Sequence, residues 1–241
     1  MLINCQAEVR PPSFPLRPVN GGPLPNARPK FGVWTHEPKI NGWRAWLHTP
    51  TRLMFNRKNE PLSITHEFKP IIEKVRAAKL PLVWLDVEAL ERRHNLGRGS
   101  LVLLDFAPGT YESGYHLSPR WTYDERQQVM YEILKCGVAT KWHYLHEPPP
   151  ENSLLTFAYT FTDYGLTKPT EEQWLPDQNM YEGEDHDGIH TGWRLLQRAN
   201  QVLGAEVFEG LVAKRNDSQY PLQLRSHEQE FPFWMKHRWA F

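Results

Sequence analysis

The chain has 241 residues, of which 40% are hydrophobic and 23% charged, as is ordinary for a soluble globular protein. Lysine plus arginine number 28 and aspartate plus glutamate number 28, so the formal net charge is zero, which argues against a general nucleic-acid binder. No apolar run approaches the ~20 residues of a membrane span, and the first residues lack a signal-peptide pattern. The two cysteines form no CxxC pair, so the sequence predicts reduced thiols and a cytoplasmic protein without a membrane partner.

The charge is unevenly distributed along the chain. Residues 171–187 contain seven acidic residues and no lysine or arginine. Without that segment the chain has 28 basic residues against 21 acidic ones. A moderately basic body with one acidic loop can still bind phosphates.

Residues 1–30 form the first predicted unit, a proline-rich arm. Seven prolines lie between positions 11 and 29, which excludes a helix or a central strand. We expect the arm to lie extended on the body, since the alternative, a free linker, would not usually begin a domain. Residues 31–241 then form the main domain.

Strands and helices alternate irregularly in that main domain. In chain order we expect strands at 31–35, 43–48 and 53–56, a helix at 70–79, strands at 82–90 and 101–106, helices at 123–136 and 192–203, and strands at 207–215 and 233–238. Without a regular βαβ rhythm, this order predicts an α+β fold with antiparallel sheets flanked by helices.

A lysine stands directly before a predicted tight turn. Lys39 is followed by the Asn41-Gly42 pair, and Arg44 begins the alternation of the next strand. On its own such a lysine is most often a solvated charge, because short motif matches have many false positives. It becomes a nucleophile only when deprotonated, and nearby cations lower a lysine pKa enough to supply that form.

Candidate partners for the lysine come late in the chain. Glu209 begins an apolar strand that also contains Lys214, and Lys236 and Arg238 alternate in the last predicted strand. Residues two apart in a strand share a face, so Lys236 and Arg238 would point together, as suits a phosphate. The alternative is a solvated edge strand. Earlier in the chain, Glu88 shares a strand face with Asp86.

The joint order of these fragments resembles the covalent nucleotidyltransferase superfamily, and most closely the adenylation domain of ATP-dependent DNA ligases. The resemblance covers about residues 34–238. Its five elements stand here as Lys39-Ile40-Asn41-Gly42-Trp43-Arg44, Asn56-Arg57-Lys58-Asn59, Asp86-Val87-Glu88, Glu209-Gly210-Leu211-Val212-Ala213-Lys214 and Trp234-Met235-Lys236-His237-Arg238. Glu37, two residues before the lysine, favours DNA ligases over capping enzymes.

The sequence departs from the family pattern at three positions. Asn41 replaces the usual aspartate, and Arg238 replaces a lysine while keeping the charge. Where the family places an aromatic side chain on the adenine, this chain has Leu104. Phe106 lies two residues further, so simple alternation predicts that it shares the face of Leu104 and can stack instead.

The resemblance implies a role for each matched residue. Lys39 would be the nucleophile, assisted in catalysis by Lys214, Lys236 and Arg238. The expected ATP and AMP contacts are Glu37, Ile40, Arg44, Arg57, Glu88, Leu104, Phe106 and Trp234. Magnesium, or manganese in its place, would be held by Glu209 and Glu88. The expected nucleic-acid contacts are Arg57, Lys58, Arg28 and Lys30.

The implied activity is sealing of nicks in duplex DNA, with DNA/RNA hybrids as further substrates. The implied setting is DNA repair, replication and recombination in a bacterial or phage-infected cell, with the enzyme acting as a monomer. Two alternatives stay open: an RNA ligase or capping-type nucleotidyltransferase, and an inactive nucleotide-binding module. Ligases of this family carry an OB-fold domain after the last element, and we expect none in this sequence. A one-domain enzyme and a piece of a longer one both fit that expectation.

Overall fold

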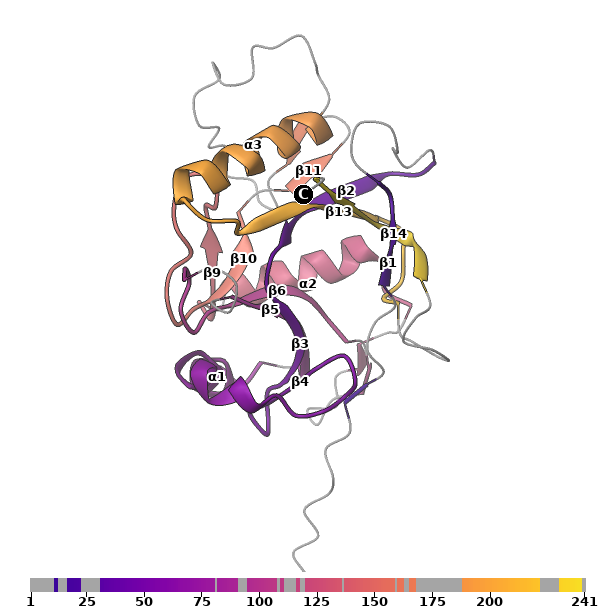
Figure 1. Ribbon diagram of the computed structural model, residues 1–241. Coiled ribbons are helices and arrows are strands. Elements are labelled where there is room, and N and C mark those ends of the chain that lie inside the picture. Colours follow the sequence, from indigo (N-terminus) through magenta and orange to yellow (C-terminus); the bar gives the residue numbers. More distant parts are fainter. Residues whose placement is uncertain are drawn as a thin grey trace, which may run out of the picture.

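The computed structural model describes residues 11–12, 17–22, 31–80, 82–90, 95–107, 109–110, 116–117, 120–135, 137–158, 160–162, 165–167, 188–221 and 230–239. The predicted nucleic-acid contacts Arg28 and Lys30, and the acidic segment 171–187, lie outside the described residues. Figure 1 shows two sheets stacked face to face, with helices on their outer sides and between them.

The first sheet contains the strand of Lys39. Its six strands follow the order β1 (Arg17–Asn20), β14 (Glu230–Arg238), β13 (Phe208–Arg215), β2 (Trp34–Ile40), β11 (Thr160–Thr162) and β12 (Gly165–Thr167). β1 pairs with β14 in parallel, whereas the other neighbours are antiparallel. β2, β13 and β14 therefore bring three of the five sequence elements side by side.

The second sheet lies opposite the first. Its order is β4 (Leu53–Phe55), β3 (Trp43–His48), β5 (Trp84–Ala89), β6 (Leu101–Phe106), β10 (Leu154–Phe157) and β9 (Ala139–Trp142). A separate two-stranded sheet joins β7 (Gly109–Thr110) to β8 (His116–Leu117). The pairs are antiparallel from β4 to β6 and parallel at β10. The predicted α+β class is thus confirmed, with three parallel pairs among mainly antiparallel ones.

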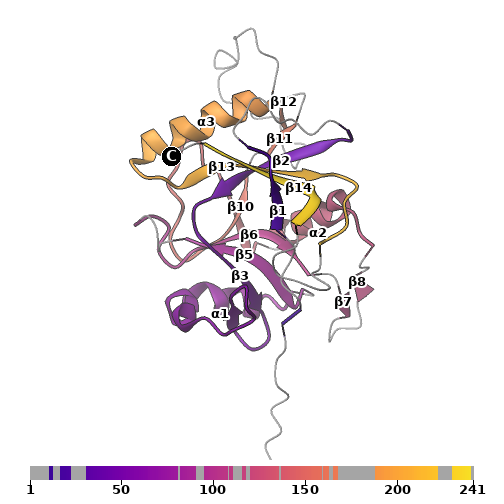
Figure 2. The same cartoon turned by 45° about the vertical axis from the view of Figure 1, so that its right-hand side comes forward.

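Helices cover both sheets. A 3₁₀ helix (Ser63–Phe68) leads into α1 (Lys69–Ala77), and α2 (Tyr123–Lys135) and α3 (Gly188–Leu203) follow. Figures 1 and 2 show α3 over the first sheet and α1 beneath the second, and α2 packs on β6 and β9. Among the described residues no helix is long and apolar enough to cross a membrane.

Hydrophobic side chains fill both faces of the second sheet. On one face the core joins Leu47, Leu85 and Phe106 to the buried stripe of α1. On the other, Val102 and Leu155 pack with residues of α3, β2 and β13. Burial stabilises by roughly 25 cal/mol for each Å² of apolar surface removed from water, and the core between the sheets holds them at a fixed separation. The polar groups between the sheets are therefore held on rigid strands.

A β-bulge interrupts β6 and corrects one expectation. Asp86 pairs with Asp105 but Val87 pairs with Leu103, so Leu104 is an extra residue on its strand. The bulge breaks the alternation of side chains. Leu104 packs toward the core between the sheets, while Phe106 is fully buried in the core beneath the second sheet, edge-on to Trp121. The prediction that Phe106 shares the face of Leu104 is wrong for this reason.

Candidate active site

Lys39 lies at the end of β2, directly before a fixed turn. The backbone N–H of Asn41 donates to the carbonyl of Val207 at 2.9 Å, and the Asn41 side chain donates to the carbonyl of Glu206 at 3.0 Å. A Cβ on Gly42 would stand 2.6 Å from the Ala89 carbonyl oxygen and 2.7 Å from Cγ of Glu88. Only glycine fits, and its absence of a side chain lets the turn pack against Glu88.

The Lys39 amine belongs to a triad of ion-paired side chains, which Glu209 and Arg238 complete. Its Nζ lies 2.8 Å from Oε2 of Glu209, and the same oxygen lies 3.0 Å from Nε of Arg238. Burial lowers the pKa of Lys39 below its usual value, Glu209 and Glu88 oppose this shift, and Arg238 adds to it. We expected cations to be the main cause of the lowered pKa, but desolvation of the ammonium is the larger one.

A second bulge turns Glu209 toward the lysine. The pairing of β13 with β2 shifts between Phe208 and Gly210, so Glu209 lies in the irregularity. Gly210 has φ of +144°, and a Cβ there would stand 1.9 Å from the carbonyl oxygen of His237. Because no other residue has room, the glycine allows the bulge that orients Glu209.

Glu88 is the second carboxylate beside Lys39. Burial raises its pKa to about 7, although Lys39 and Arg44 favour the charged form. Arg44 faces Glu88 across the β3–β5 pair, but its guanidinium binds Asp86 through two hydrogen bonds of 2.9 and 2.5 Å. The Tyr220 hydroxyl also donates to Asp86, at 2.7 Å. Asp86 therefore fixes Arg44, a function that sequence reasoning did not assign to it.

Glu37 and Lys214 form a buried pair further along β2. Oε2 of Glu37 lies 2.8 Å from Nζ of Lys214, and Oε1 accepts a 2.5 Å hydrogen bond from the Tyr123 hydroxyl. The Lys214 amine also donates to the carbonyl of Leu104 at 3.1 Å and lies 4.8 Å from the centre of the Trp234 ring. The structure thus places Lys214 beside Glu37 and the buried Trp234.

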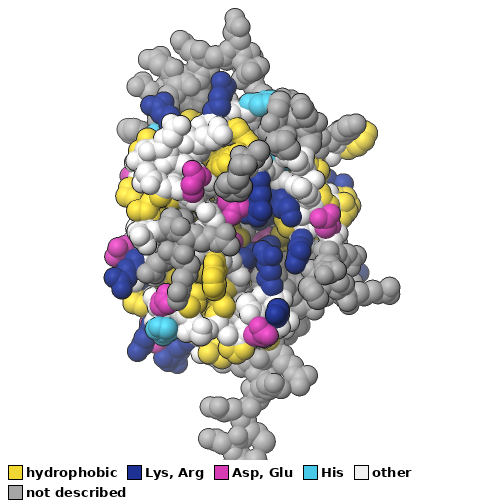
Figure 3. All heavy atoms as spheres, in the orientation of Figure 1, with side chains coloured by type: hydrophobic (Ala, Val, Ile, Leu, Met, Phe, Trp, Pro, Cys, Tyr) yellow, Lys and Arg dark blue, Asp and Glu magenta, His cyan; other side chains and the backbone are white. Residues whose placement is uncertain are grey.

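Basic side chains gather around the triad. Burial and Arg238 lower the pKa of Lys236, and Lys39 and Arg17 contribute to the same shift. Partial burial, followed by Arg44 and other cations, lowers the pKa of Arg57. Figure 3 shows Lys and Arg side chains clustered at the centre of this face. An excess of positive charge over the few carboxylates suits an anionic ligand.

Arg57 and Lys58 stand in an exposed turn after β4. The Asn56 side-chain oxygen accepts from the backbone N–H groups of Lys58, at 2.8 Å, and Glu60, at 3.1 Å, which fixes the turn. Both cations are therefore presented to solvent from an ordered loop. Ile40, also predicted as a contact, is a core residue between the sheets.

Sequence reasoning also missed the ion pair between Arg126 and Asp105. Arg126 on α2 and Asp105 on β6 are both fully buried and lie 2.9 Å apart. Arg126 also donates to the carbonyls of Trp121 and Ser218, which leaves few of its N–H groups unpaired. Helical spacing could have indicated this pair. Arg126 precedes the inward-facing Met130 by one turn, so it lies on the buried face of the helix, where a charged side chain needs a buried partner.

The carboxylates do not form a metal cage. Within the described part of the chain, no group of three or more His, Cys, Asp or Glu side chains is placed to hold a metal ion. Glu209 and Glu88 flank Lys39, and magnesium is commonly bound by one or two carboxylates together with substrate phosphates. The residues present fit a metal ion that arrives with a phosphate ligand.

Three solved structures are similar to this chain in fold. The structure named "Pmar-Lig_Pre." matches with a TM-score of 0.51 and 17% identity over 92% of this chain and 46% of its own. The Chlorella virus DNA ligase-adenylate has a TM-score of 0.47 and 17% identity, over 93% of this chain and 69% of its own. The ligase domain of M. tuberculosis LigD also has a TM-score of 0.47 and 17% identity, over 92% of this chain and 59% of its own.

These matches concern the fold. No family model and no curated protein sequence matches the chain. The structure named "Pmar-Lig_Pre.", with a TM-score of 0.51, covers most of this chain, so the predicted likeness is confirmed at the level of the fold alone. The chain spans between about half and two thirds of the length of those structures.

Proposed function

We propose that the chain is the nucleotidyltransferase part of an ATP-dependent polynucleotide ligase and that Lys39 becomes linked to AMP. The observation that supports this most is the arrangement around Lys39. A partly buried amine with a lowered pKa contacts one carboxylate, lies near a second, and is surrounded by cations suited to phosphate. The order of the five sequence elements and the shared fold agree with it.

The proposed first step is an in-line substitution at phosphorus. The deprotonated Nζ of Lys39 attacks the α-phosphorus of ATP, forming a P–N bond while the P–O bond to pyrophosphate breaks. Glu209, 2.8 Å from Nζ, holds the amine in position, and the lowered pKa lets the amine lose its proton to solvent water. Lys236 and Arg238 neutralise the charge on the departing pyrophosphate.

Magnesium fits this step as a companion of the phosphates. Bound through phosphate oxygens with Glu209 and Glu88, it would supply positive charge where negative charge accumulates. Side chains of the protein orient the other groups that take part in this step. Asp86 keeps Arg44 oriented through its two hydrogen bonds, and the bulge at Gly210 keeps Glu209 against Lys39.

The proposed later steps act on a nick in duplex DNA or a DNA/RNA hybrid. The 5′-phosphate oxygen attacks the lysyl-AMP phosphorus and releases Lys39. The 3′-hydroxyl then attacks the activated 5′-phosphate and AMP leaves. Arg57 and Lys58, which are exposed on a turn fixed by Asn56, would contact the phosphates of the strand.

Intact-protein mass spectrometry tests the first step. After incubation with ATP and magnesium, wild-type protein should carry one added AMP, and Lys39→Ala should carry none. A parallel incubation with GTP distinguishes capping chemistry. An adduct that persists in Lys39→Ala, or an adduct formed only from GTP, would contradict the proposal, as would the absence of any adduct.

Gel-resolved sealing tests the later steps. Protein already charged with AMP should join a nicked duplex at low salt, and substrates with DNA or RNA on either side of the nick define the preference. Charged protein that joins none of these substrates would overturn the ligase assignment while leaving the lysyl-AMP chemistry in place.

A further inference from the structure

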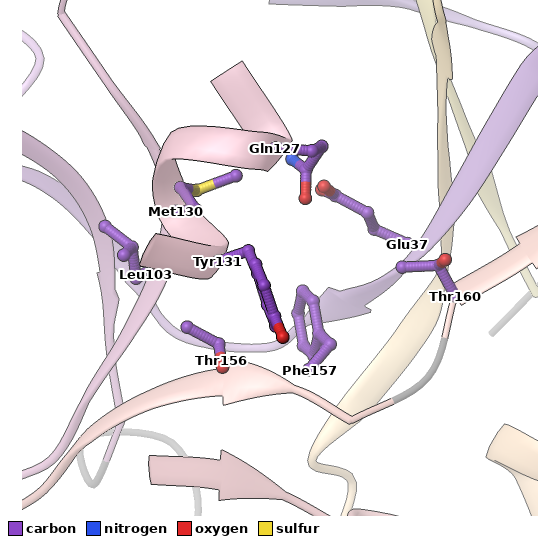
Figure 4. Close-up of a pocket in the computed structure, with 8 residues that line it drawn as sticks. All are labelled: Glu37, Leu103, Gln127, Met130, Tyr131, Thr156, Phe157 and Thr160. Atoms are coloured by element: carbon purple, nitrogen blue, oxygen red, sulfur yellow. The ribbon is translucent and has the colours of Figure 1, made fainter. Parts of the chain in front are cut away.

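A pocket lies beside Glu37, two residues before Lys39 on the same strand. It is enclosed by α2, β6, β10 and β11, and its lining consists of Glu37, Leu103, Gln127, Met130, Tyr131, Thr156, Phe157 and Thr160. Figure 4 shows the Gln127 and Glu37 side chains approaching each other on one side of the pocket. Leu103, rather than Leu104 or Phe106, is the β6 residue that reaches it.

Two polar atoms in this pocket have no hydrogen-bond partner. They are Nε2 of Gln127 and the hydroxyl oxygen of Thr156, and both are buried. A buried polar group without a partner is costly, so native structures rarely keep one without a reason. Two of them in one pocket, next to apolar walls from Leu103, Met130 and Phe157, suit a flat apolar ligand with polar edges.

The hydrogen-bonding groups next to the pocket determine which polar edge of such a ligand would bind there. Each Glu37 oxygen keeps a lone pair after its contact with Tyr123 or Lys214, so Glu37 can still accept a hydrogen bond. The Gln127 amide, turned so that Nε2 faces the ligand, can donate one beside it. An acceptor next to a donor matches the 6-amino group and N1 of adenine. Guanine presents a carbonyl oxygen and an N–H at those positions, which reverses both partners.

We propose that Gln127 and Thr156, which lie outside the five sequence elements, read the adenine of the bound nucleotide. Gln127 donates to N1, Thr156 donates to another ring nitrogen, and the Glu37 carboxylate accepts from the 6-amino group. Glu37 and Lys39 are separated by about 7 Å along the strand, which leaves room for the ribose between base and α-phosphate. The inference rests on the proposed function for the identity of the nucleotide.

A substitution paired with an ATP analogue tests the hydrogen bond to N1. Gln127→Leu should raise the KM for ATP in lysyl-AMP formation about tenfold. In 1-deaza-ATP a C–H replaces N1. The KM of wild-type protein for this analogue should be higher than its KM for ATP by a similar factor, whereas the KM of Gln127→Leu should rise little further. Gln128→Leu, at an exposed position one residue along α2, is the matched control and should match wild type. If 1-deaza-ATP raises the KM of wild-type protein and of Gln127→Leu by the same factor, the assignment is overturned.

Thr156→Val removes only the second donor and keeps the shape of the side chain. It should raise the KM for ATP several-fold without changing kcat, because the base is far from the reacting phosphorus. An unchanged KM would remove Thr156 from the proposed contacts.

A binding measurement separates failure of this inference from failure of the proposed function. Calorimetric titration with adenosine requires no chemistry at Lys39, so binding that weakens in Gln127→Leu supports the base contact even if no lysyl-AMP forms. Thermal unfolding without ligand adds a second readout. Gln127→Leu should not be less stable than wild type, because the donor it removes is unpaired. A lower melting temperature, together with unchanged adenosine binding, would show a structural role and overturn the inference.

Discussion

Glu88 is a buried carboxyl group whose charge changes close to neutral pH. Burial raises its pKa from 4.5 to about 7 in the folded protein, against the opposing pull of Lys39 and Arg44. The folded protein therefore binds this proton more tightly than the unfolded chain does. Stability associated with Glu88 is present below about pH 4.5 and is lost as the pH rises toward 7.

The isosteric variant Glu88→Gln should reveal this pH dependence. Its free energy of unfolding should be close to that of wild type near pH 4.5 and should exceed it by up to about 3 kcal/mol at about pH 8, since each pKa unit corresponds to about 1.4 kcal/mol. Urea unfolding at a series of pH values measures the difference. Glu132→Gln, on the exposed side of α2, controls for the lost charge. A difference that does not vary with pH would contradict the raised pKa.

At the residue scale, sequence predicted the charged groups better than their partners. Lys39, Glu209 and Arg238 could be grouped because their residue types and order carry a chemical pattern, and the structure brings all three together. The Asp105–Arg126 pair belongs to no pattern of adjacent residues. A pairing across 21 positions, between a helix and a strand, depends on packing that spacing alone does not determine.

The β13 bulge is the element on which the orientation of Glu209 depends. Gly210→Ala would place a Cβ 1.9 Å from the His237 carbonyl oxygen, so β13 and β14 must separate or the bulge must flatten. We expect lysyl-AMP formation to fall at least about a hundredfold, because displacement of a catalytic group by about 1 Å costs that much. Quantitative mass spectrometry of the adduct over time measures the rate.

A second glycine provides the control for backbone strain. Gly137 has φ of +72° but no heavy atom within 4 Å of a built Cβ. Gly137→Ala should lose about 1 kcal/mol of stability through the left-handed backbone, with adduct formation unchanged. Equal activity losses in the two variants would mean that strain, and not the orientation of Glu209, is responsible.

Long, strongly patterned elements were predictable and short ones were not. α1 and α2 begin and end within two residues of their expected bounds, because apolar residues recur at helical spacing over several turns. β9 to β12 have three or four residues each, too few for alternation to distinguish a strand from a loop. The bulge at Leu104 was hidden because an extra residue leaves no mark in the hydrophobic pattern.

Across the whole molecule, a net charge of zero conceals a local excess of positive charge. Arg17 and Arg238 each lower the pKa of both Lys236 and Arg57, and Glu209 is already shared between Lys39 and Arg238. The overall balance is therefore a poor guide to partners, because a ligand responds to the field at the site.

Under the proposed function, binding to nicked duplex DNA should depend steeply on salt. With ~4–6 phosphate contacts and a slope of about −0.9 for each, affinity should fall roughly a hundredfold or more between about 50 and 200 mM salt. Fluorescence anisotropy over a salt series measures the slope. Arg57→Gln should reduce its magnitude by about 1, whereas Arg198→Gln, on the exposed side of α3, should leave it unchanged. Identical slopes for both variants would place the DNA elsewhere.

The pairing of β1 with β14 has a consequence for folding during translation. Asn20 lies beside Lys236, so β1 is synthesised more than 200 residues before the strand with which it pairs. Contacts between such distant positions raise the contact order and slow folding, and β1 can join the first sheet only after β14 has been translated. Until β14 is available, β1 has no partner in this sheet. Pro18, which lacks an N–H, then limits the pairing of β1 with other chains.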